Sequence, residues 1–525
     1  ERNEQLCHIV EHNLPLLGLN NATVVCADAV EYLSTVEPQT MLFLDPARRD
    51  EHGAKTVMLA DCTPDVVQLL PKLLEKSRFT MLKLSPMLDW HKAVDDLQGT
   101  VREVHIVSVG GECKELLLVC SAESKGVPTV YCVNDRQVCV FTPDDSQPRY
   151  LDTPAGEGMY LYDENGTPYL DFYAGIAVNN AGNRNPKVVA AVKDQVDDIM
   201  HTFNYPYTIP QALLAEKVCK TLGMDKIFYQ NSGTEANEAM IKMARKYGIE
   251  KYGPNRYHIV TAKDGFHGRT FGAMSATGQP GNGCQVGFGP MTYGFSYAPY
   301  NDLKAFKDAC TENTIAIMIE PVQGEGGVHP ATQEFMKGLR EFCDEKGMLL
   351  LLDEVQTGWC RTGAVMSYMN YGVKPDIVSM AKGLGGGMPI GAICATEEVS
   401  KAFTAGSHGT TFGGHPISCA AALAEVGELL DRDLAGNAKK VGDYFAAKLE
   451  KLPHVKEVRH QGLLVGVEFD DTISGVDVKH GCFDRKLLIT AIGAHIIRMV
   501  PPLIVSEEEC DKAVEIIEEA VKALS

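Results

Sequence analysis

The fold is decided by residues 348–354, MLLLLDE, in which an apolar run ends at two acids. Two further segments share this design: IAIMI at 315–319 ends at Glu320, and IVSMA at 377–381 ends at Lys382. Apolar runs without alternation are typical of strands buried on both faces, and in open α/β sheets ligands gather beyond the carboxyl ends of the strands. We therefore expect an α/β sheet with one crevice in which an acid and a lysine meet.

An anion-binding site is expected at the start of a helix. Residues 230–238, QNSGTEANE, follow an apolar strand and open a helix with apolar residues at helical spacing, which we expect to close at Gly248. Backbone amides at a helix start attract a phosphate, Gly233 lets the backbone approach closely, and Thr234 adds a hydroxyl. Residues 232–235 also have the spacing of a capping box, an interpretation that does not exclude the anion site.

The turn that contains Lys382 is rich in glycine, but it does not match the G-x-x-x-x-G-K-[ST] or G-x-G-x-x-G motifs of nucleotide-binding loops. Taken alone, this lysine is explained as a surface residue of a loop. Together with Asp353 at the end of a neighbouring strand, it is better explained as a lysine that binds pyridoxal phosphate as a Schiff base. The buried carboxylate would keep the pyridine nitrogen protonated, so that the ring can act as an electron sink.

Six motifs follow one another along the C-terminal part of the chain: SGTEAN (232–237), GFHGRT (265–270), EPVQGEGG (320–327), DEVQTGWCRTG (353–363), SMAKGLGGG (379–387) and HGTTFGGHP (408–416). In order and spacing they resemble the class III (subgroup II) pyridoxal-phosphate-dependent aminotransferases, over about residues 156–525. The resemblance implies an α/β protein of PLP-dependent transferase fold type I. It further implies a large mixed-sheet domain at about 200–415 and a small α/β domain formed by 151–199 and 416–525.

The resemblance assigns a role to individual residues of these motifs. Lys382 would bind the cofactor covalently, Asp353 would pair with the pyridine nitrogen, and Phe266 would stack on the ring. The other expected cofactor-binding residues are Gly233, Thr234, Glu354, Val355, Gln356 and Thr411, the last of which would reach the phosphate of the neighbouring subunit of a homodimer with shared active sites. The expected substrate-binding residues are Arg269, Thr410, Arg498 and Glu325.

Within the family, the chain most resembles the acetylornithine aminotransferases. Residues 169–179, YLDFYAGIAVN, resemble the substrate side of those enzymes, with residues 176–178 where ornithine aminotransferases tend to carry a tyrosine. The implied reaction converts N-acetylornithine and 2-oxoglutarate to N-acetylglutamate 5-semialdehyde and glutamate, a step of arginine biosynthesis. Ornithine, 4-aminobutyrate and succinyl-diaminopimelate are the alternative amine donors.

A physical argument also supports the assignment of Arg269 and Arg498 to substrate binding. A glutamate-linked transaminase binds a dicarboxylate, and a planar guanidinium is the preferred partner of a carboxylate. The first substrate, however, reacts at a terminal amine that has no carboxylate beside it. A nearby acid must therefore mask one arginine, and we expect Glu325 to pair with Arg498 for this purpose.

Residues 1–121 have a different sequence pattern, in which helical stretches alternate with short apolar runs. This alternation predicts a doubly wound sheet. The motifs ERN (1–3), ADA (27–29) and LDPARR (44–49) resemble the later motifs of class I S-adenosylmethionine-dependent methyltransferases, particularly a THUMP-like bacterial group, with Asp28 near the adenine. The resemblance implies a partial Rossmann-like segment. Because no first strand with its Gly-rich turn precedes these motifs, we expect no methylation by this segment alone. The expected helix covers 3–17, and the expected strands are 23–26, 41–44, 81–84, 104–107 and 115–119.

Two interpretations of this arrangement are open. One is a truncated gene joined to an unrelated one. The other is a fusion in which the first segment has a separate function, such as methylation of nucleic acid. Residues 122–150 mix turn formers with short strand-like runs and are interpreted as a linker or a broken-off small domain.

The composition of the chain excludes several other classes of protein. The chain has 525 residues, a formal charge of −20 and 45% hydrophobic residues, which is ordinary for globular domains. So negative a charge argues against binding nucleic acid through its phosphates. Sixteen cysteines without a C-x-x-C spacing suit a reducing compartment and indicate no metal site. No apolar run approaches the roughly 20 residues that span a bilayer, so we expect a cytoplasmic protein without a membrane partner.

Overall fold

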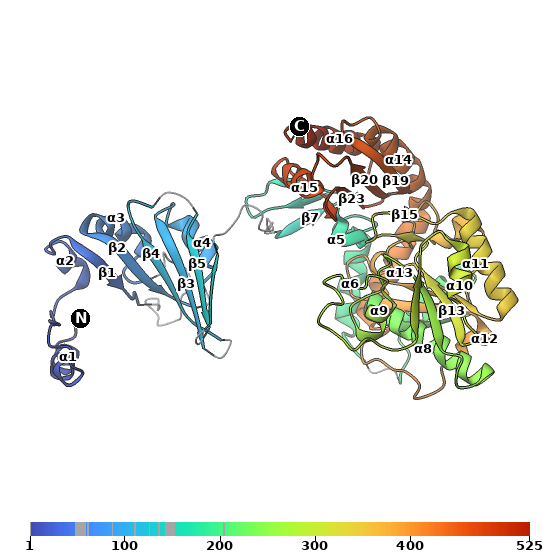
Figure 1. Cartoon of the computed structure of the whole chain (residues 1–525), viewed down its shortest axis with the longest axis horizontal. Coiled ribbons are helices and arrows are strands. Elements are labelled where there is room, and N and C mark those ends of the chain that lie inside the picture. Colours follow the sequence, from blue (N-terminus) through green and yellow to red (C-terminus); the bar gives the residue numbers. More distant parts are fainter. Residues whose placement is uncertain are drawn as a thin grey trace. The chain divides into compact units, whose positions relative to one another are not determined.

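The structure is a computed structural model that describes residues 2–47, 59, 62–86, 88–109, 112–124, 127–134, 137–141, 153–202 and 205–524. The chain divides into two compact units, Glu1–Arg149 and Tyr150–Ser525 (Figure 1). Arg48 and Arg49 of the methyltransferase-like motif and the expected boundary near residue 150 lie outside the described residues.

Unit 1 is built on a six-stranded sheet in the order β1-β2-β4-β3-β5-β6. Helix α3 carries the strongest apolar face of this unit, and Val66, Leu70 and strand residues such as Leu82 share its hydrophobic core. The elements of unit 1 are α1 (Glu4–Leu16), α2 (Ala29–Leu33), β1 (Gln39–Leu44), α3 (Val66–Lys76), β2 (Ser77–Leu84), α4 (Trp90–Asp96), β3 (Val101–Val109), β4 (Glu112–Cys120), β5 (Thr129–Asn134) and β6 (Gln137–Phe141).

This sheet differs from the expected doubly wound sheet, because only the pairs β1/β2 and β3/β5 are parallel. Strands β3 and β4 are separated by two residues in the sequence, and so short a connection allows only an antiparallel hairpin. The expected strand at 23–26 is also wrong: these residues form no strand and Val25 is exposed, so burial does not stabilise an extended pairing there. Residues 129–141, expected to belong to a linker or a separate small domain, form β5 and β6 of the sheet.

The larger sheet of unit 2 has seven strands in the order β10-β18-β17-β16-β13-β11-β12, and β18 runs antiparallel to both of its neighbours. The three apolar runs of the sequence are its central strands β13, β16 and β17, all completely buried. Alternate residues of β13 enter two different cores: Ile317 and Ile319 pack on one side, Ala316 and Met318 on the other. The strands are β10 (Lys226–Gln230), β11 (His258–Ala262), β12 (Phe295–Ala298), β13 (Thr314–Ile319), β16 (Leu349–Asp353), β17 (Ile377–Met380) and β18 (Gly391–Ala395).

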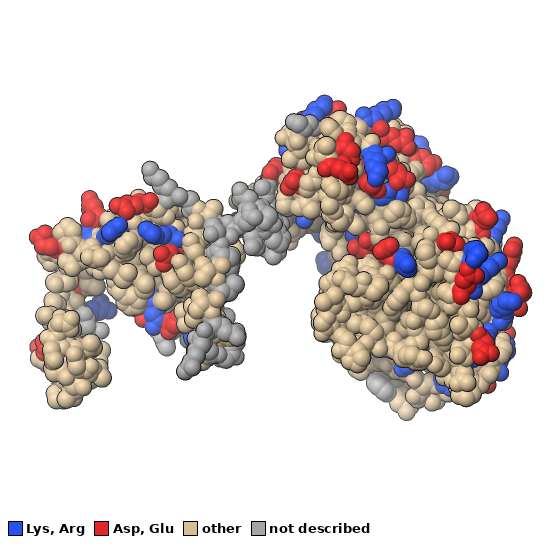
Figure 2. Space-filling view, viewed as in Figure 1, with Lys and Arg blue, Asp and Glu red and all other residues tan. Residues whose placement is uncertain are grey.

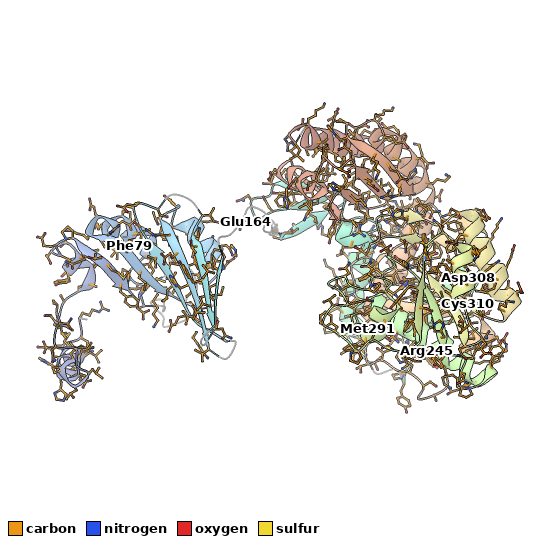
Figure 3. All side chains as sticks on the ribbon, viewed as in Figure 1. Phe79, Glu164, Arg245, Met291, Asp308 and Cys310 are labelled. Carbon is orange, nitrogen blue, oxygen red and sulfur yellow. The ribbon has the colours of Figure 1, made fainter. Side chains whose placement is uncertain are left out.

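Helices cover this sheet, and α8 is the one that carries the expected anion site. Arg245, which is labelled in Figure 3, lies on α8. It stacks its guanidinium over Phe295 of β12 at 4.7 Å and donates to the Tyr293 carbonyl at 2.7 Å. The helices and short strands of this region are α5 (Ala174–Ala177), α6 (Pro186–Asp198), α7 (Ile209–Leu222), α8 (Gly233–Tyr252), α9 (Phe271–Ala276), α10 (Leu303–Ala309), β14 (Val322–Gln323), β15 (His329–Pro330), α11 (Gln333–Lys346), α12 (Glu397–Ser400) and α13 (Pro416–Asp431).

The expected end of α8 at Gly248 is wrong, since the helix continues to Tyr252. A Cβ atom at Gly248 would lie 2.2 Å from the Arg256 carbonyl oxygen and 2.7 Å from Cγ1 of Ile315. The glycine therefore allows the helix to lie close against β13 and the chain at Arg256, and does not terminate it.

Two four-stranded sheets complete unit 2, in the orders β19-β20-β23-β22 and β21-β9-β8-β7. The C-terminal helix α16 begins with the predicted capping box, in which Ser506 and Glu509 bond each other's backbone amides. The elements are β7 (Ala155–Glu157), β8 (Tyr160–Tyr162), β9 (Pro168–Asp171), α14 (Leu434–Leu449), β19 (Val455–Gln461), β20 (Leu464–Phe469), α15 (Gly475–Asp484), β21 (Leu487–Leu488), β22 (Thr490–Ile492), β23 (Ile496–Met499) and α16 (Glu507–Lys522).

Two further features of the described chain are the distribution of charge on its surface and the length of its apolar helices. On the face drawn in Figure 2, acidic and basic side chains of unit 2 lie interspersed. Within the described ranges, no helix is both long enough and apolar enough to cross a membrane.

Candidate active site

A cavity of about 510 Å³ lies at the carboxyl ends of β13, β16 and β17. It brings together residues that are far apart in the sequence, because the polar residue after each buried strand reaches the same edge of the sheet. Eight of the expected site residues line it: Gly233, Thr234, Phe266, Arg269, Asp353, Val355, Gln356 and Lys382.

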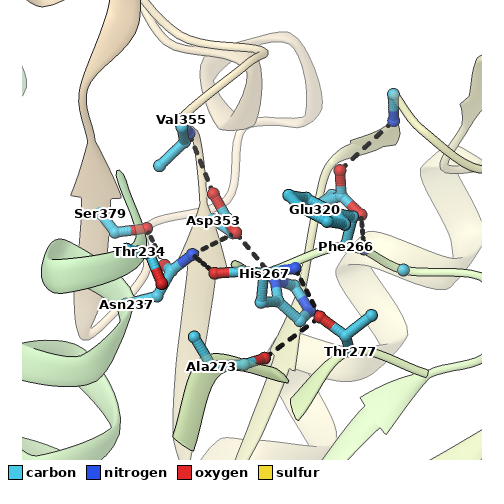
Figure 4. A network of polar contacts seen from close by, with 12 residues as sticks. Thr234, Asn237, Phe266, His267, Ala273, Thr277, Glu320, Asp353, Val355 and Ser379 are labelled. Carbon is cyan, nitrogen blue, oxygen red and sulfur yellow. Dashed lines mark hydrogen bonds and ion pairs between the residues drawn. The ribbon is translucent and has the colours of Figure 1, made fainter. Parts of the chain in front are cut away.

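The Asp353 carboxylate is almost completely buried, with 3% of the residue exposed, and it is held by three donors (Figure 4). Its Oδ2 accepts from Nδ2 of Asn237 and from Nδ1 of His267, both at 2.7 Å. Its Oδ1 accepts from the Val355 amide at 3.0 Å. A buried carboxylate without such donors would be costly, and hydrogen bonds of this kind favour its ionised form.

His267 lies beneath the cavity and forms an ion pair with this carboxylate. Burial lowers the pKa of its imidazole, but the hydrogen bond and the charge of Asp353 outweigh burial and raise that pKa overall. Glu320 is also buried, and its carboxylate accepts from the Phe266 amide at 2.9 Å. Burial raises the pKa of Glu320 to about 7, so the wall of the cavity contains a carboxyl group that titrates near neutral pH.

Lys382 opens a short 3-10 helix, η3 (Lys382–Leu384), directly after β17 and has a left-handed backbone conformation with φ of 46°. Burial lowers the pKa of its amine to about 8. Within the part of the chain that the structure describes, no group accepts a hydrogen bond from this amine. The next residue must be glycine, because a Cβ atom at Gly383 would lie 2.3 Å from Nδ2 of Asn180. The sequence thus places a nucleophilic amine in the cavity.

The start of α8 forms one end of the cavity. Ser232 caps the helix by accepting from the Glu235 amide at 3.3 Å, whereas the Glu235 carboxylate accepts from the Asn231 amide at 2.8 Å. The capping box is therefore incomplete. The amides of Gly233 and Thr234 face no acceptor among the described residues, and with the helix dipole they suit an anion.

Gly233 is needed for packing as well as for anion binding. A Cβ atom at this position would lie 2.6 Å from Cγ1 of Val355, so the glycine lets α8 approach the loop after β16. The Thr234 hydroxyl hydrogen-bonds the Thr270 hydroxyl at 2.9 Å, which joins the helix start to the loop that carries Phe266.

Arg498 and Glu325 form the expected pair. Nη1 of Arg498 donates to Oε1 of Glu325 at 2.6 Å and to Oε1 of Gln356 at 3.2 Å, and Nε2 of Gln356 donates to the same Glu325 oxygen at 3.2 Å. Burial alone would raise the pKa of Glu325, but the charge and hydrogen bond of Arg498, the charge of Lys382 and the hydrogen bond of Gln356 together outweigh burial and lower that pKa. Neither Arg498 nor Glu325 lines the cavity itself, whereas Gln356, which hydrogen-bonds both of them, does.

Three other expected residues also lie away from the cavity. Glu354 turns its buried carboxylate to the hydroxyl of Thr357 and to the amides of Ser367 and Tyr368, so it holds the following loop. Thr410 accepts from Nδ2 of Asn231 at 3.1 Å. Thr411 is exposed, and both threonines line a second, larger cavity of about 1010 Å³.

The sequence interpretation missed two polar residues of this network, Asn237 and Ser379. Each had a usable signal. Asn237 follows Thr234 by three residues on a helix and so lies on the same side. Ser379 is the polar residue within an otherwise apolar strand, and a hydroxyl buried in that way requires a hydrogen-bond partner.

A mixed α/β fold whose cavity contains a half-buried amine, a buried carboxylate and an anion-binding helix start is typical of a group-transfer enzyme that uses an amine-linked cofactor. The chain belongs to the class-III aminotransferases, and the model of the family "Aminotransferase class-III" matches residues 141–521.

Among the similar proteins of this family are several acetylornithine aminotransferases. The chain is 45% identical over 368 residues to the acetylornithine aminotransferase of Methanocaldococcus jannaschii, covering 69% of this chain and 92% of that protein. It is 42% identical over 375 residues to the acetylornithine aminotransferase of Bacillus subtilis, covering 71% and 95%.

Solved structures agree with this family. The ornithine aminotransferase of Toxoplasma gondii ME49 matches with a TM-score of 0.69 and 32% identity, covering 73% of this chain and 92% of that one. A second structure of the Toxoplasma gondii enzyme, crystallised with oxidized glutathione, contains PLP at partial occupancy in its active site; it covers 72% and 92%, with a TM-score of 0.69 and 32% identity.

Proposed function

We propose that this aminotransferase transfers the terminal amino group of N-acetylornithine to 2-oxoglutarate. The observation that supports the reaction class most directly is that Lys382 and Asp353 line one cavity. Support for the substrate comes from relatives named as acetylornithine aminotransferases, of which this chain covers 92% or more. Val178, within the segment where ornithine aminotransferases tend to carry a tyrosine, lines the cavity and leaves its wall apolar there.

The cofactor is pyridoxal phosphate, and the residues around the cavity fit its three functional groups. The free amides of Gly233 and Thr234 suit a phosphate, Lys382 suits an aldehyde, and the hydrogen-bonded carboxyl group of Asp353 suits a protonated ring nitrogen. When bound, pyridoxal phosphate supplies an electron sink for the carbon that carries the amino group.

The protein's own part in the chemistry is the movement of a proton. The Lys382 amine has a pKa lowered to about 8 by burial, so a substantial fraction is neutral near physiological pH and can accept a proton. In the first half-reaction the amine would take a proton from the carbon that carries the amino group and deliver one to the cofactor, and in the second it would move a proton in the opposite direction, so each half-reaction leaves Lys382 unchanged. Asp353 would accept the hydrogen bond of the ring nitrogen and is held in place for this by its own donors.

Substrate selection is proposed to depend on Arg498. In the first half-reaction, Glu325 pairs with Arg498 and masks its charge while a substrate without a neighbouring carboxylate reacts. In the second half-reaction, a carboxylate of 2-oxoglutarate takes the place of Glu325, because a guanidinium binds a carboxylate through two parallel hydrogen bonds. Arg269, whose guanidinium lies 5.8 Å from the Phe266 ring, is proposed to bind the other carboxylate.

A half-reaction screen tests the proposal. Each candidate amine is added in turn to the cofactor-loaded protein, and the loss of the visible absorbance of the lysine-bound cofactor is followed. N-acetylornithine should bleach this absorbance fastest. Rapid bleaching by 4-aminobutyrate with no response to N-acetylornithine would show the substrate to be wrong. Lys382→Ala should lack both the absorbance and turnover, and appreciable residual transamination by this variant would contradict the assigned role.

For unit 1 we infer no methylation by the unit alone, and its resemblance to class I methyltransferases stays a hypothesis. Asp28, expected near the adenine, uses Oδ1 to cap α2 through the Val30 amide at 2.9 Å. Asp45 is 3.3 Å from Lys83. Equilibrium dialysis of the full chain with labelled S-adenosylmethionine is the test, with no retention expected. Saturable binding would overturn this inference and leave the aminotransferase assignment untouched.

A further inference from the structure

The carboxylate of Asp353 accepts hydrogen bonds from three chemically different donors. Val355 contributes a backbone amide and His267 contributes an imidazole that can carry charge. Asn237 contributes a neutral carboxamide, buried to 1% exposure, that bonds the carboxylate from α8. A neutral donor stabilises the ionised carboxylate without adding a charge that competes with a cationic ligand for it.

The orientation of the Asn237 carboxamide follows from its surroundings (Figure 4). Its Nδ2 donates to Oδ2 of Asp353 and to the carbonyl of His267, both at 2.7 Å, and its Oδ1 accepts from the Ser379 hydroxyl at 2.6 Å. A flipped amide would place its oxygen against two acceptors and its NH₂ group against the serine. These two acceptors set the orientation of the carboxamide, and the hydroxyl of Ser379 stabilises it further by donating to the amide oxygen.

Ser379 is placed for this task by the sheet. It lies on β17 opposite Asp353 of β16, as its partner in the parallel register, and it is completely buried. Its carbonyl accepts from the Glu354 amide at 3.0 Å, which holds the strand ends together, while its side chain contacts Asn237. A chain of two hydrogen bonds thus runs from one central strand, through α8, to the carboxylate on the neighbouring strand.

We propose that Ser379 and Asn237 are positioning residues for the cofactor: the serine hydroxyl holds the asparagine carboxamide, and the carboxamide keeps the Asp353 carboxylate aimed at the ring nitrogen. The proposal rests on the proposed function, since it assumes that this nitrogen meets Asp353. Without the hydroxyl, the Asn237 oxygen loses its donor, so the carboxamide is held less firmly and its hydrogen bond to Asp353 weakens.

Other titratable groups around Asp353 are the same before and after a change at Ser379. His267 bonds the carboxylate directly, Glu320 and Lys382 lie on the same cavity, and Glu354 directs its carboxylate toward Thr357. A difference between Ser379 variants therefore reports on the asparagine and not on these charges.

The test compares Ser379→Ala with Ser367→Ala in the cofactor-loaded full chain. Ser367 is a matched control, since it is equally buried and its hydroxyl donates to Gln461 at 3.0 Å, away from the cavity. The readouts are the pH midpoint of the visible absorbance change of the bound cofactor, the dissociation constant of pyridoxal phosphate and the melting temperature.

For Ser379→Ala we expect the absorbance midpoint to rise by about one pH unit and the dissociation constant to increase roughly tenfold. A ring nitrogen that holds its proton less firmly repels the proton on the lysine-bound nitrogen less, which raises the midpoint. Ser367→Ala should lower the melting temperature without moving the midpoint. If Ser379→Ala does not fold, Ser379→Cys replaces it, because a thiol of similar shape is a much weaker donor.

A Ser379 variant with the midpoint of Ser367→Ala would overturn the proposal, because a merely structural serine affects stability alone. Failure of the proposed function is a separate outcome. In that case the unmodified protein would develop no visible absorbance with pyridoxal phosphate, whereas a coloured variant with an unchanged midpoint removes only the role of Ser379 and Asn237.

Discussion

At the scale of single residues, the site depends on ionisable groups whose pKa values are shifted because they are removed from water. Burial lowers the pKa of Lys382 to about 8 and raises the pKa of Glu320 to about 7. The buried Asp353 carboxylate is held by three hydrogen-bond donors, which offset the cost of removing it from water. The chemistry of the cavity thus follows from which buried groups receive hydrogen bonds.

Replacing Glu325 should separate the two half-reactions. In Glu325→Gln the Arg498 guanidinium loses the charge that masks it, so it attracts the carboxylate of the donor into an unproductive position. We expect the half-reaction with N-acetylornithine to slow at least about tenfold, while the reaction with glutamate is retained. Single-turnover absorbance measurements with each amine give both rates. Glu397→Gln, at an exposed pair with Lys226, is the control; equal slowing of both half-reactions would contradict masking.

Glu425 offers a pH test of a buried carboxyl group. Burial raises its pKa from 4.5 to about 8, although Oε1 accepts from the Ala181 amide at 2.9 Å. The folded state then binds more protons than the unfolded state between these pH values, so the stability that this group contributes falls as pH rises from 4.5 to about 8.

Glu425→Gln removes this titration but keeps an acceptor for the Ala181 amide. The advantage of the variant over the natural protein should therefore grow with pH, to about 1–3 kcal/mol near pH 8. Melting temperatures measured between about pH 5 and pH 8 provide the comparison, with the exposed Glu216→Gln as control. A constant difference across this range would show that the carboxyl group is ionised throughout.

At the scale of elements, glycines decide how closely α8 approaches its neighbours. Gly233 accommodates Val355 at the cavity, and Gly248 accommodates Arg256 and Ile315 in the C-terminal part of the helix. Helix propensity alone would favour alanine at both positions, so the close contacts outweigh propensity.

Gly248→Ala should destabilise unit 2 despite the better helix propensity of alanine. Its Cβ atom would lie 2.2 Å from a backbone oxygen, which forces α8 away from β13, and we expect a loss of about 1–3 kcal/mol. Gly427→Ala on α13 is the matched control, because its Cβ atom would meet only the flexible Lys217 amine at 3.5 Å. Thermal unfolding should show the control neutral or stabilised; a stabilised Gly248→Ala would refute the packing argument.

At the scale of the whole molecule, the single chain leaves part of the proposed site exposed. Thr411 faces a cavity that is distinct from the one containing Lys382, and large apolar side chains such as Tyr207 and Phe412 are exposed near it. We propose a homodimer in which Thr411 reaches the phosphate bound by the other subunit.

Mixing two inactive variants tests this arrangement. Lys382→Ala lacks the amine, and Thr411→Glu should repel the phosphate in the other subunit. Each variant alone should have little activity. After equal mixing and exchange of subunits, about one quarter of the natural activity should return, since half of the dimers are mixed and each contains one intact site. Steady-state assays on the mixture, with light scattering to establish the dimer, decide the matter; monomers, or mixed dimers without recovery, would refute a shared site.

Local sequence patterns determined much of this protein. The apolar runs before Glu320, Asp353 and Lys382 predicted three buried strands with a shared polar edge, because burial on both faces leaves only apolar residues in a strand. The capping box of α16 was equally readable, since it involves residues three apart. The pairing of Glu325 with Arg498 was expected from the chemistry of the substrates and is present at 2.6 Å.

Only the tertiary structure decided which polar groups satisfy one another. Asn237 and Ser379 meet Asp353 because β16, β17 and α8 pack together, and Glu354 turns to the loop at Ser367 although it follows Asp353 directly. Likewise, Gly248 does not end α8. A glycine is needed there because Arg256 and Ile315 occupy the space that a side chain at this position would take. The physical reason is common to all three: periodicity and capping involve neighbours along the chain, whereas a buried hydrogen bond or a close contact depends on which distant segment lies opposite.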